Sequence, residues 1–306
     1  VEQEGETTVS ARKMSELCRS LPNGENVEFK LNEGKLSVSS KNFNGDFATI
    51  SADDFPELEV NEEQDTADIP SDALKRILTK TSFSMAFNDA RHFLNGLFFE
   101  INDEKITVVA TDGHRLAKFE ISLPEGADKI PGIIIPKKTI NEVRKIIEEF
   151  SGSVRISLNE SKMLFSINNI TIFSKLIDGT FPDYAKVIPK NNDKSFLVNK
   201  KIIYEAVDRV STVSNEKTKS IKLIIFDNNI SLSSNSLETG TGAEDIKIEY
   251  SGDKIDVGYN ARYLMEMINQ IDGDMITFKL LDSSSPSIIL DTKNEKLLYI
   301  LMPMRV

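Results

Sequence analysis

The feature that most constrains the fold of this chain is an internal repeat. Segments 9–21 and 259–271 place apolar residues at i, i+3, i+4 and i+7, and segment 135–147 places them at i, i+3 and i+7, which is the spacing of a helix with one buried face. A glutamate holds the same place in each segment. These residues, Glu16, Glu142 and Glu266, lie 126 and 124 residues apart. Three copies of one structural unit are therefore expected.

The residues after each repeated helix match as well. Val27–Glu33 and Val154–Glu160 both alternate apolar and polar residues, which predicts half-buried strands. A Phe-Pro corner then follows at Asp54–Glu57 and at Thr180–Asp183. In the third copy, strands are expected at 275–281 and 287–290, and the chain ends without this corner.

A second helix precedes each complete copy. Its buried face is predicted to hold Ala73, Leu74, Ile77 and Leu78 in one copy, and Ile202, Ile203, Ala206 and Val207 in the other. Strands follow it, at 97–109 and 223–232. The unit thus reads helix, strands, helix, strands, which predicts an α+β fold with two helices packed on antiparallel β-sheets.

The repeat sets the domain boundaries. We expect a partial first domain at 1–66, a second domain at 67–193 and a third at 194–306. The first copy begins only at its second helix. The chain also starts at Val1 rather than Met, so we expect a fragment or a processed chain. Residues ahead of Val1 should supply roughly 60 residues, a helix and hairpins, to complete the first copy.

Charge is distributed unevenly between the predicted helices and the rest of the chain. The net charge is −11, but the five helical segments together carry +7, which leaves −18 for the remainder. A shared helical face of this kind could lie near a phosphate backbone without gripping it. The alternative is that these are ordinary solvated helix faces, and the charge pattern alone does not decide between the two.

Few residues suggest catalysis or metal binding. The two histidines, His92 and His114, have no second His or Cys at metal-ligand spacing, and no glycine-rich phosphate loop or other cofactor motif appears. The single cysteine, Cys18, lies on an apolar helix face, which favours a buried core residue and a reducing compartment. Asp112 and His114 could form an acid–base pair, but Asp-Gly between two strands (107–110 and 116–121) more often makes a tight turn or binding loop.

The last ten residues, 297–306, are apolar almost to the end. A free chain end is normally polar and frayed, so this segment should be a buried final strand or the wall of an apolar groove. Met302 and Met304 suit an adaptable binding surface, because the thioether side chain is flexible and polarisable.

Several motifs together resemble those of one family, the β subunit of bacterial DNA polymerase III, or sliding clamp. They are Ala110-Thr-Asp-Gly-His-Arg-Leu116, Phe181-Pro-Asp-Tyr184, Ser214-Asn-Glu-Lys217, Tyr250-Ser-Gly252 and Met302-Pro-Met-Arg305. The resemblance runs from about Thr7 to Val306. It implies a homodimer joined head to tail into a ring, with helices lining the hole and duplex DNA threaded through without sequence readout. It also implies a cytoplasmic, nucleoid-associated bacterial protein without catalytic activity or cofactor.

The resemblance further implies a pocket between the second and third domains. Short hydrophobic peptides of polymerase subunits, of the clamp loader and of repair polymerases would bind there. Lys186 stands where an arginine is expected, and Ser284 where a small apolar residue is common. The implied pocket residues are Leu94, Thr111, Gly113, His114, Arg115, Leu116, Pro182, Lys186, Val187, Ile300, Met302, Pro303, Met304 and Arg305, with Ser284 and Pro286 at the rim.

Two further surfaces come with the resemblance. The residues implied to face DNA are Arg12, Lys13, Asn88, Arg91, Lys137 and Lys138. In the ring contact, Thr212 and Val213 of one chain would meet Phe43 or Phe47 of another. Thr212 replaces a usual large aliphatic residue at this position.

Two other functions stay open at the level of sequence. One is an acidic repeat adaptor that binds peptides but never encircles DNA. The other is a hydrolase that uses Asp112 and His114. Loss of a measurable turnover in His114→Ala, with peptide binding retained, would favour the hydrolase.

Overall fold

A computed structural model describes residues 3–32, 34–55, 65–159 and 162–306. The chain divides into two compact units, Val1–Asn61 and Glu62–Val306, and each is considered by itself. The expected Phe-Pro corner at Asp54–Glu57, like Glu33 and Glu160, lies partly or wholly outside the described residues.

The smaller unit holds one helix and a small antiparallel sheet. Helix α1 (Ala11–Ser20) begins after Ser10, whose hydroxyl accepts a hydrogen bond from the Lys13 amide, as an N-cap residue should. The described strands pair in the order β1-β2-β3, and a short 3₁₀ turn follows them. Their bounds are β1 (Glu28–Asn32), β2 (Lys35–Ser40), β3 (Phe43–Ala48) and η1 (Ala52–Asp54).

Two expectations for this unit are wrong. Cys18 is exposed rather than buried, and β1 is exposed along its whole described length instead of half-buried. The reason is the small amount of core. Among the described hydrophobic residues of this unit, only Leu17 and Val38 are buried. One helix and three short strands offer too little apolar surface to cover both faces.

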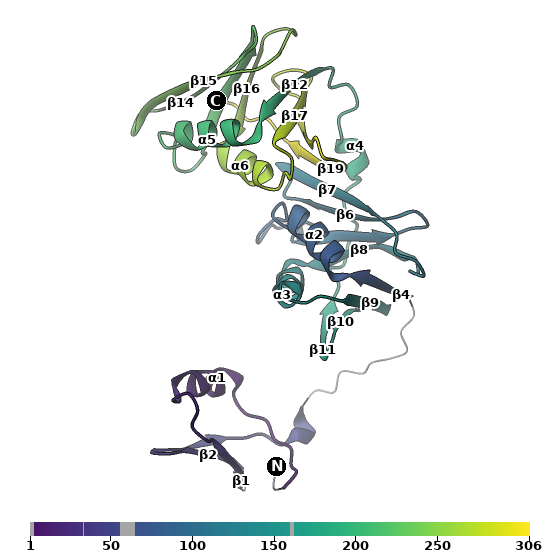
Figure 1. Cartoon of the computed structure of the whole chain (residues 1–306), viewed down its shortest axis with the longest axis vertical. Coiled ribbons are helices and arrows are strands. Elements are labelled where there is room, and N and C mark those ends of the chain that lie inside the picture. The colour runs from purple at the N-terminus through teal and green to yellow at the C-terminus, as the bar shows by residue number, and fades with distance from the viewer. Residues whose placement is uncertain (1–2, 33, 56–64, 160–161) are drawn as a thin grey trace. The chain divides into compact units, whose positions relative to one another are not determined.

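The larger unit contains two consecutive copies of the predicted helix–strand unit (Figure 1). The helices of the second copy in the chain are α2 (Ser71–Ser82) and α3 (Lys137–Ile147), and those of the third are α5 (Lys200–Ser211) and α6 (Ala261–Asn269). Asn199 and Asn260 cap α5 and α6 through their side-chain oxygens. The predicted apolar faces are buried with two exceptions: Ala73 of α2 is only partly buried, and Ile202, in the first turn of α5, is exposed.

The strands form three antiparallel sheets. A four-stranded sheet has the order β11-β10-β9-β4, and another has the order β15-β14-β13-β16. Between them lies an eight-stranded sheet, β12-β17-β18-β19-β7-β6-β5-β8, to which both copies contribute four strands. The bounds of the four-stranded sheets are β4 (Asp65–Pro70), β9 (Ser153–Asn159), β10 (Lys162–Ile167), β11 (Ile170–Lys175), β13 (Ser220–Phe226), β14 (Asn229–Ser236), β15 (Gly240–Lys247) and β16 (Ile255–Asn260).

The eight-stranded sheet fixes the two copies to each other. Its central junction is the antiparallel pair β19–β7, in register from Leu297 opposite Phe119 to Leu301 opposite Arg115. Its strands are β5 (Gly96–Ile101), β6 (Lys105–Thr111), β7 (Arg115–Ser122), β8 (Ile130–Pro136), β12 (Lys194–Asn199), β17 (Met275–Leu280), β18 (Ser287–Asp291) and β19 (Asn294–Leu301). The shorter helical turns η2 (His92–Leu94) and α4 (Tyr184–Val187) flank it.

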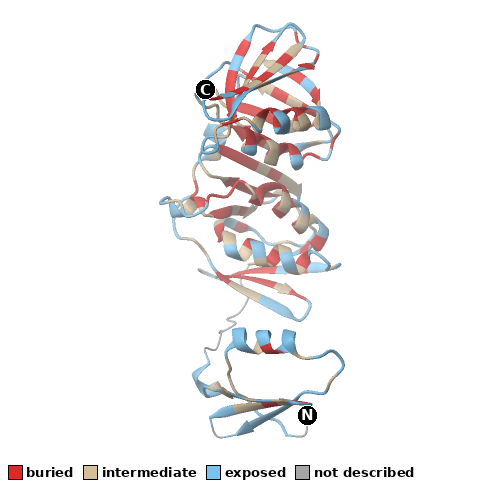
Figure 2. Cartoon of the chain, turned by 90° about the vertical axis from the view of Figure 1, so that its left-hand side faces the viewer, coloured by how far each residue is buried: buried red, intermediate tan, exposed pale blue. Residues whose placement is uncertain are grey.

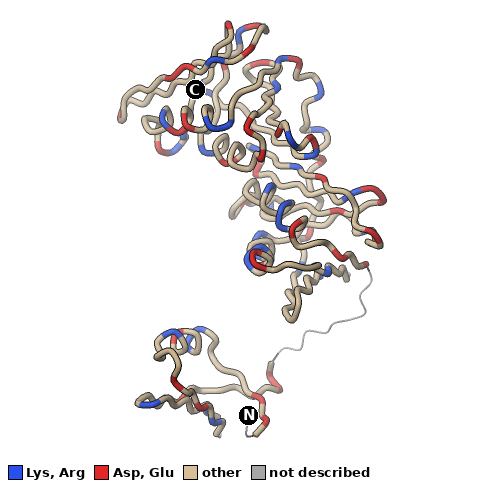
Figure 3. Tube along the Cα trace, in the orientation of Figure 1, with Lys and Arg blue, Asp and Glu red and all other residues tan. Residues whose placement is uncertain are grey.

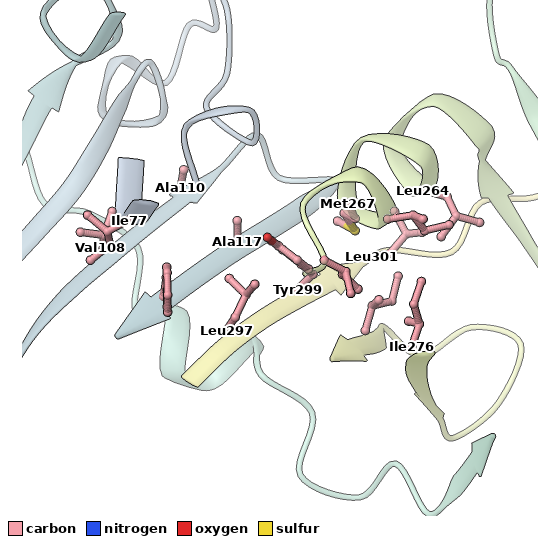
Figure 4. Packing of buried hydrophobic residues seen from close by; sticks show 14 of the residues in the cluster. Ile77, Val108, Ala110, Ala117, Leu264, Met267, Ile276, Leu297, Tyr299 and Leu301 are labelled. Carbon is pink, nitrogen blue, oxygen red and sulfur yellow. The ribbon is translucent and has the colours of Figure 1, made fainter. Parts of the chain in front are cut away.

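One continuous core runs across that junction on the helical side of the sheet (Figures 2 and 4). Ala117 of β7 and Tyr299 and Leu301 of β19 pack there with Met267 of α6. The Tyr299 hydroxyl reaches across the copies and donates a 3.1 Å hydrogen bond to the carbonyl oxygen of Lys80. The sheet junction and this core together make the two copies one body. None of the described helices is long and apolar enough to span a membrane.

Candidate functional site

The segment Thr111–Arg115 forms a tight turn between β6 and β7. The Asp112 carboxylate accepts hydrogen bonds from the backbone amides of His114 (2.9 Å) and Arg115 (3.0 Å), which is an Asx turn. The Thr111 hydroxyl donates to the Arg115 carbonyl oxygen at 2.6 Å. The turn is thus built by its own side chains, as Asp-Gly between two strands predicts.

Gly113 and Arg91 fit closely in this turn. Gly113 has a φ of +87°, in the left-handed region that favours glycine, and a Cβ there would lie 3.1 Å from two guanidinium nitrogens of Arg91. Arg91 itself is held by both carboxylate oxygens of Asp89 and donates to the Asp112 carbonyl oxygen at 3.3 Å. The hydrogen bonds from Arg91 lower the pKa of Asp89 to about 2.

We expect Gly113→Ala to loosen this turn, because alanine is strained at this φ and would press on Arg91. The strain should be about 1 kcal/mol, or roughly fivefold faster hydrogen exchange at the amides of His114 and Arg115. Gly126→Ala is the matched control, since Gly126 also has a positive φ (+76°) but nothing within 4 Å of its Cβ position. Equal exchange in the turn for both variants would contradict the prediction.

The C-terminal tail runs beside the turn. β19 ends at Leu301, and the backbone amide of Met302 then donates to the carbonyl oxygen of His114 at 2.9 Å. Two residues later the Met304 amide donates to the carbonyl oxygen of Gly258, also at 2.9 Å. Met302, Pro303 and Met304 are all partly exposed. The segment is therefore a buried strand as far as Leu301, as one of the two sequence alternatives predicts, and it is partly exposed beyond that residue.

Beneath the turn and the tail lies a second apolar cluster, on the side of the eight-stranded sheet away from the main core. Leu116 and Ile300 from the predicted pocket are buried in it with Val109, Ile134 and Phe181. Partly buried residues surround them, namely Phe93, Phe98, Ile177, Tyr184, Ile188 and Leu298. Leu116 and Ile300 are directly opposite each other in the β19–β7 pair. The two predicted walls thus meet at one apolar floor.

The remaining predicted pocket residues differ in burial and in the element that carries them. Leu94 is buried in η2, whereas Val187 and Lys186 are exposed on α4, where Lys186 pairs with Asp183 at 3.0 Å. Pro182 follows the buried Phe181 directly. Pro286 comes just before β18, whose first residue, Ser287, pairs with Leu301 of β19. Ser284 lies in a turn made by Asp282, and Arg305 is exposed.

Arg115 is the exception among the predicted pocket residues. Successive side chains of a strand point to opposite faces, so Arg115 lies on the helical side of the sheet while Leu116 lies on the other. Its guanidinium pairs with Asp112 and with Glu266 of α6, and it is only 7% exposed. The Arg115 side chain therefore lies on the helical side of the sheet, and the apolar cluster lies on the other side.

The sequence-based list missed several residues at this site. Tyr263 of α6 stacks on the His114 ring, with 6.4 Å between ring centroids, and Val109 and Phe181 complete the apolar floor. Alternation along β6 and β7 could have predicted Val109. It lies opposite Lys118, and Lys118 is two positions after Leu116 on β7, so Val109 and Leu116 face the same side of the sheet. Nothing in the sequence alone brings α6 to this turn.

The residues expected to face DNA differ in their exposure and in their contacts. Arg12 and Lys13 are exposed on α1, and Lys138 is exposed on α3. Lys137 donates to the carbonyl oxygens of Met85 and Ala86, and burial together with the nearby Arg115 charge lowers its pKa. Asn88 is exposed in the loop after α2. The Arg91 guanidinium pairs with Asp89 and packs on the turn at Gly113.

A hollow of about 1060 Å³ lies over α3, and Lys137, Lys138, Asn88 and Lys145 are among its lining residues. It includes none of the predicted peptide-pocket residues. Lysines and arginines follow the helices here and on α2 and α5, interspersed with acidic residues (Figure 3). The charge asymmetry read from the sequence therefore follows the helices along the chain.

The residues expected at the ring contact lie on β3 and just after α5. Phe43 and Phe47 are on the same face of β3, both partly exposed. Thr212 caps the end of α5, donating to the Arg209 carbonyl oxygen at 2.7 Å, and Val213 touches the Gly242 position of β15. In the described sheet orders, β3 and β15 are both edge strands.

The hydrolase alternative finds no support in this geometry. The Asp112 carboxylate is already occupied by two backbone amides and by Arg115 Nε at 3.1 Å, while the His114 ring lies against Tyr263. Within the described ranges, no group of three or more His, Cys, Asp or Glu side chains could hold a metal ion.

Comparison with known proteins defines the class of protein. Three family models match in succession: the N-terminal domain of the DNA polymerase III beta subunit at residues 1–59, its central domain at 68–183 and its C-terminal domain at 185–305. The chain is 35% identical to the beta sliding clamp of Caulobacter vibrioides over 99% of its own length and 83% of that protein. It is 33% identical to the Escherichia coli beta sliding clamp, with 99% and 82% covered.

A solved structure supports the same class of protein. The DnaN sliding clamp of Bartonella birtlesii, bound to griselimycin, superposes with a TM-score of 0.95 at 36% identity, covering 100% of this chain and 83% of that one. The chain therefore belongs to the DNA polymerase III beta subunit family, the bacterial sliding clamps. It is a non-catalytic processivity subunit that encircles DNA and tethers polymerase and other proteins through peptide motifs.

Proposed function

We propose that two copies of this chain close a ring head to tail through β3 of one and β15 of the other. The observation that supports this is the junction β19–β7 inside the chain. Within their copies of the repeat, β3 and β19 are each the third strand after the second helix. β7 and β15 are each the third strand after the first helix. Strand β3 of one chain would therefore pair with β15 of the other as β19 pairs with β7 within the chain. Phe43 and Phe47 would then meet Thr212 and Val213.

Within that ring, we assign the peptide pocket to the turn 111–115, the tail 302–305 and the apolar cluster between them. Arg91 joins this pocket, because its guanidinium packs on Gly113. The partners would be polymerase subunits, the clamp loader and repair polymerases. The residues left to face DNA are Arg12, Lys13, Asn88, Lys137 and Lys138, whose weak positive surface suits sliding without sequence readout. The domains would be 1–66, 67–193 and 194–306, and the location cytoplasmic and nucleoid-associated.

Retention on DNA tests the ring. After loading onto a closed circular plasmid by a bacterial clamp loader, the chain should stay bound through gel filtration, and cutting the plasmid should release it. Phe47→Asp should abolish retention, because a charge at an apolar contact without a partner is destabilising. Phe226→Asp, at another exposed phenylalanine, is the control. Equal retention on circular and linear DNA would contradict encirclement.

A further inference from the structure

The repeated glutamate behaves differently in the third copy. Glu16 pairs with Arg12 at 2.9 Å and Glu142 with Lys145 at 2.9 Å, and all four of these side chains are well exposed. Glu266 likewise pairs with an exposed neighbour on its own helix, Arg262, at 2.9 Å. Its second oxygen, however, binds Arg115, which belongs to the preceding copy of the repeat.

Arg115 is a buried cation, and all three of its guanidinium nitrogens donate hydrogen bonds. Besides Glu266, its guanidinium donates to Asp112 at 3.1 Å and to the Phe83 carbonyl oxygen at 2.8 Å. The guanidinium carbon lies 4.3 Å from the centre of the Tyr263 ring, in cation–π geometry. A buried charge needs this degree of pairing, so the position of the guanidinium depends on Glu266.

The same arginine holds the turn above it. The Asp112 carboxylate that Arg115 binds also accepts the amides of His114 and Arg115, and so shapes the turn. The Tyr263 ring contacts both His114 and Arg115, since it stacks on the His114 ring and also meets the Arg115 guanidinium. The backbone carbonyl oxygen of His114 in turn accepts the hydrogen bond from the Met302 amide in the tail. A chain of direct contacts therefore joins Glu266 to both walls of the pocket.

We infer that Glu266 is a positioning residue of the peptide pocket. From α6, on the opposite side of the sheet, it fixes Arg115, and through Arg115 it fixes the Asp112 turn and the His114 ring. This inference rests on the proposed pocket. Hydrogen bonds from Arg262 and Arg115 outweigh the effect of burial and lower the pKa of Glu266, so the carboxylate is charged at neutral pH.

Griselimycin, which is bound to the Bartonella birtlesii clamp, serves as the probe, and on the proposed function it occupies the peptide pocket of this chain. By calorimetry, Glu266→Gln should raise its Kd about fivefold, since an uncharged amide leaves the buried Arg115 with a single carboxylate. Glu142→Gln changes the equivalent residue of the second copy and should stay within about twofold. Failure of the unmodified chain to bind griselimycin would count against the proposed pocket itself. An unchanged Kd in Glu266→Gln would overturn the role of Glu266.

A spectroscopic measurement separates positioning from general destabilisation. The chain has two histidines, so ¹³C-labelled histidine gives two ring signals, which His92→Gln assigns. Glu266→Gln should shift the His114 signal, because the ring loses its fixed place on Tyr263, and should leave the His92 signal in place. A raised Kd with both signals shifted, or with the His114 signal unmoved, would also overturn the inference.

Discussion

Replacing Met302 and Met304 together with alanine should weaken peptide binding by at least about fiftyfold, since two side chains would be lost from one apolar binding surface. Both methionines are partly exposed, and their backbones are fixed by hydrogen bonds to His114 and Gly258. The substitutions therefore remove flexible apolar contacts without releasing the tail. Affinity for griselimycin, measured by calorimetry, gives the result directly.

Met275→Ala provides the matched control. Met275 begins β17, is exposed and lies outside the predicted pocket. Its loss should leave the Kd within about twofold, since an exposed side chain away from the interface contributes little. Far-UV circular dichroism should be the same for all three proteins. If the double variant kept the affinity of the unmodified chain, the tail would not be a wall of the pocket.

The repeat in the sequence predicted the order of elements because a helix with one apolar face and strands with alternating residues leave different periodicities. Ile140, Val143 and Ile147 were identified in this way, and all are buried in α3. The method failed where an apolar residue lies at an element end or in a unit with little core. Ile202 lies in the first turn of α5, and Cys18 belongs to the small unit, and both are exposed.

The candidate site could be predicted only where it is local. The turn at Asp112 and Gly113 follows from residue types, since its hydrogen bonds join neighbours in the chain. The roles of Tyr263 and Glu266 do not, because they depend on a helix about 150 residues away being placed under the turn by the β19–β7 junction. The face to which Arg115 points likewise depends on which side of β7 the helices cover.

Removing one partner or the other of the Lys80–Asp272 pair, at the boundary between the two copies of the larger unit, should change the free energy of unfolding by different amounts. Lys80 is 11% exposed and donates to Asp272 and to the Gln270 carbonyl oxygen, whereas Asp272 is 45% exposed and also pairs with Arg76 at 3.5 Å. Asp272→Asn leaves an ammonium group buried without its carboxylate, and should lower the free energy of unfolding by about 2 kcal/mol after allowance for solvent. Lys80→Met leaves a hydrated carboxylate with Arg76, and should change it by less than about 1 kcal/mol.

The pH dependence of stability gives a second test of the same pair. Burial raises the pKa of Asp272, but hydrogen bonding and charge from Lys80 and then Arg76 outweigh it, so the pKa lies below its ordinary value of 3.8. A carboxyl group with a lowered pKa stabilises the fold fully above the unfolded-state value, and this contribution is lost as the pH falls through the lowered pKa. In urea unfolding followed by circular dichroism, the gap between the unmodified chain and Asp272→Asn should therefore be constant near neutral pH. It should narrow below about pH 4, where protonation removes the same charge as the substitution. A gap that widened in acid, or a larger loss from Lys80→Met than from Asp272→Asn, would mean that the buried ammonium group does not depend on this carboxylate.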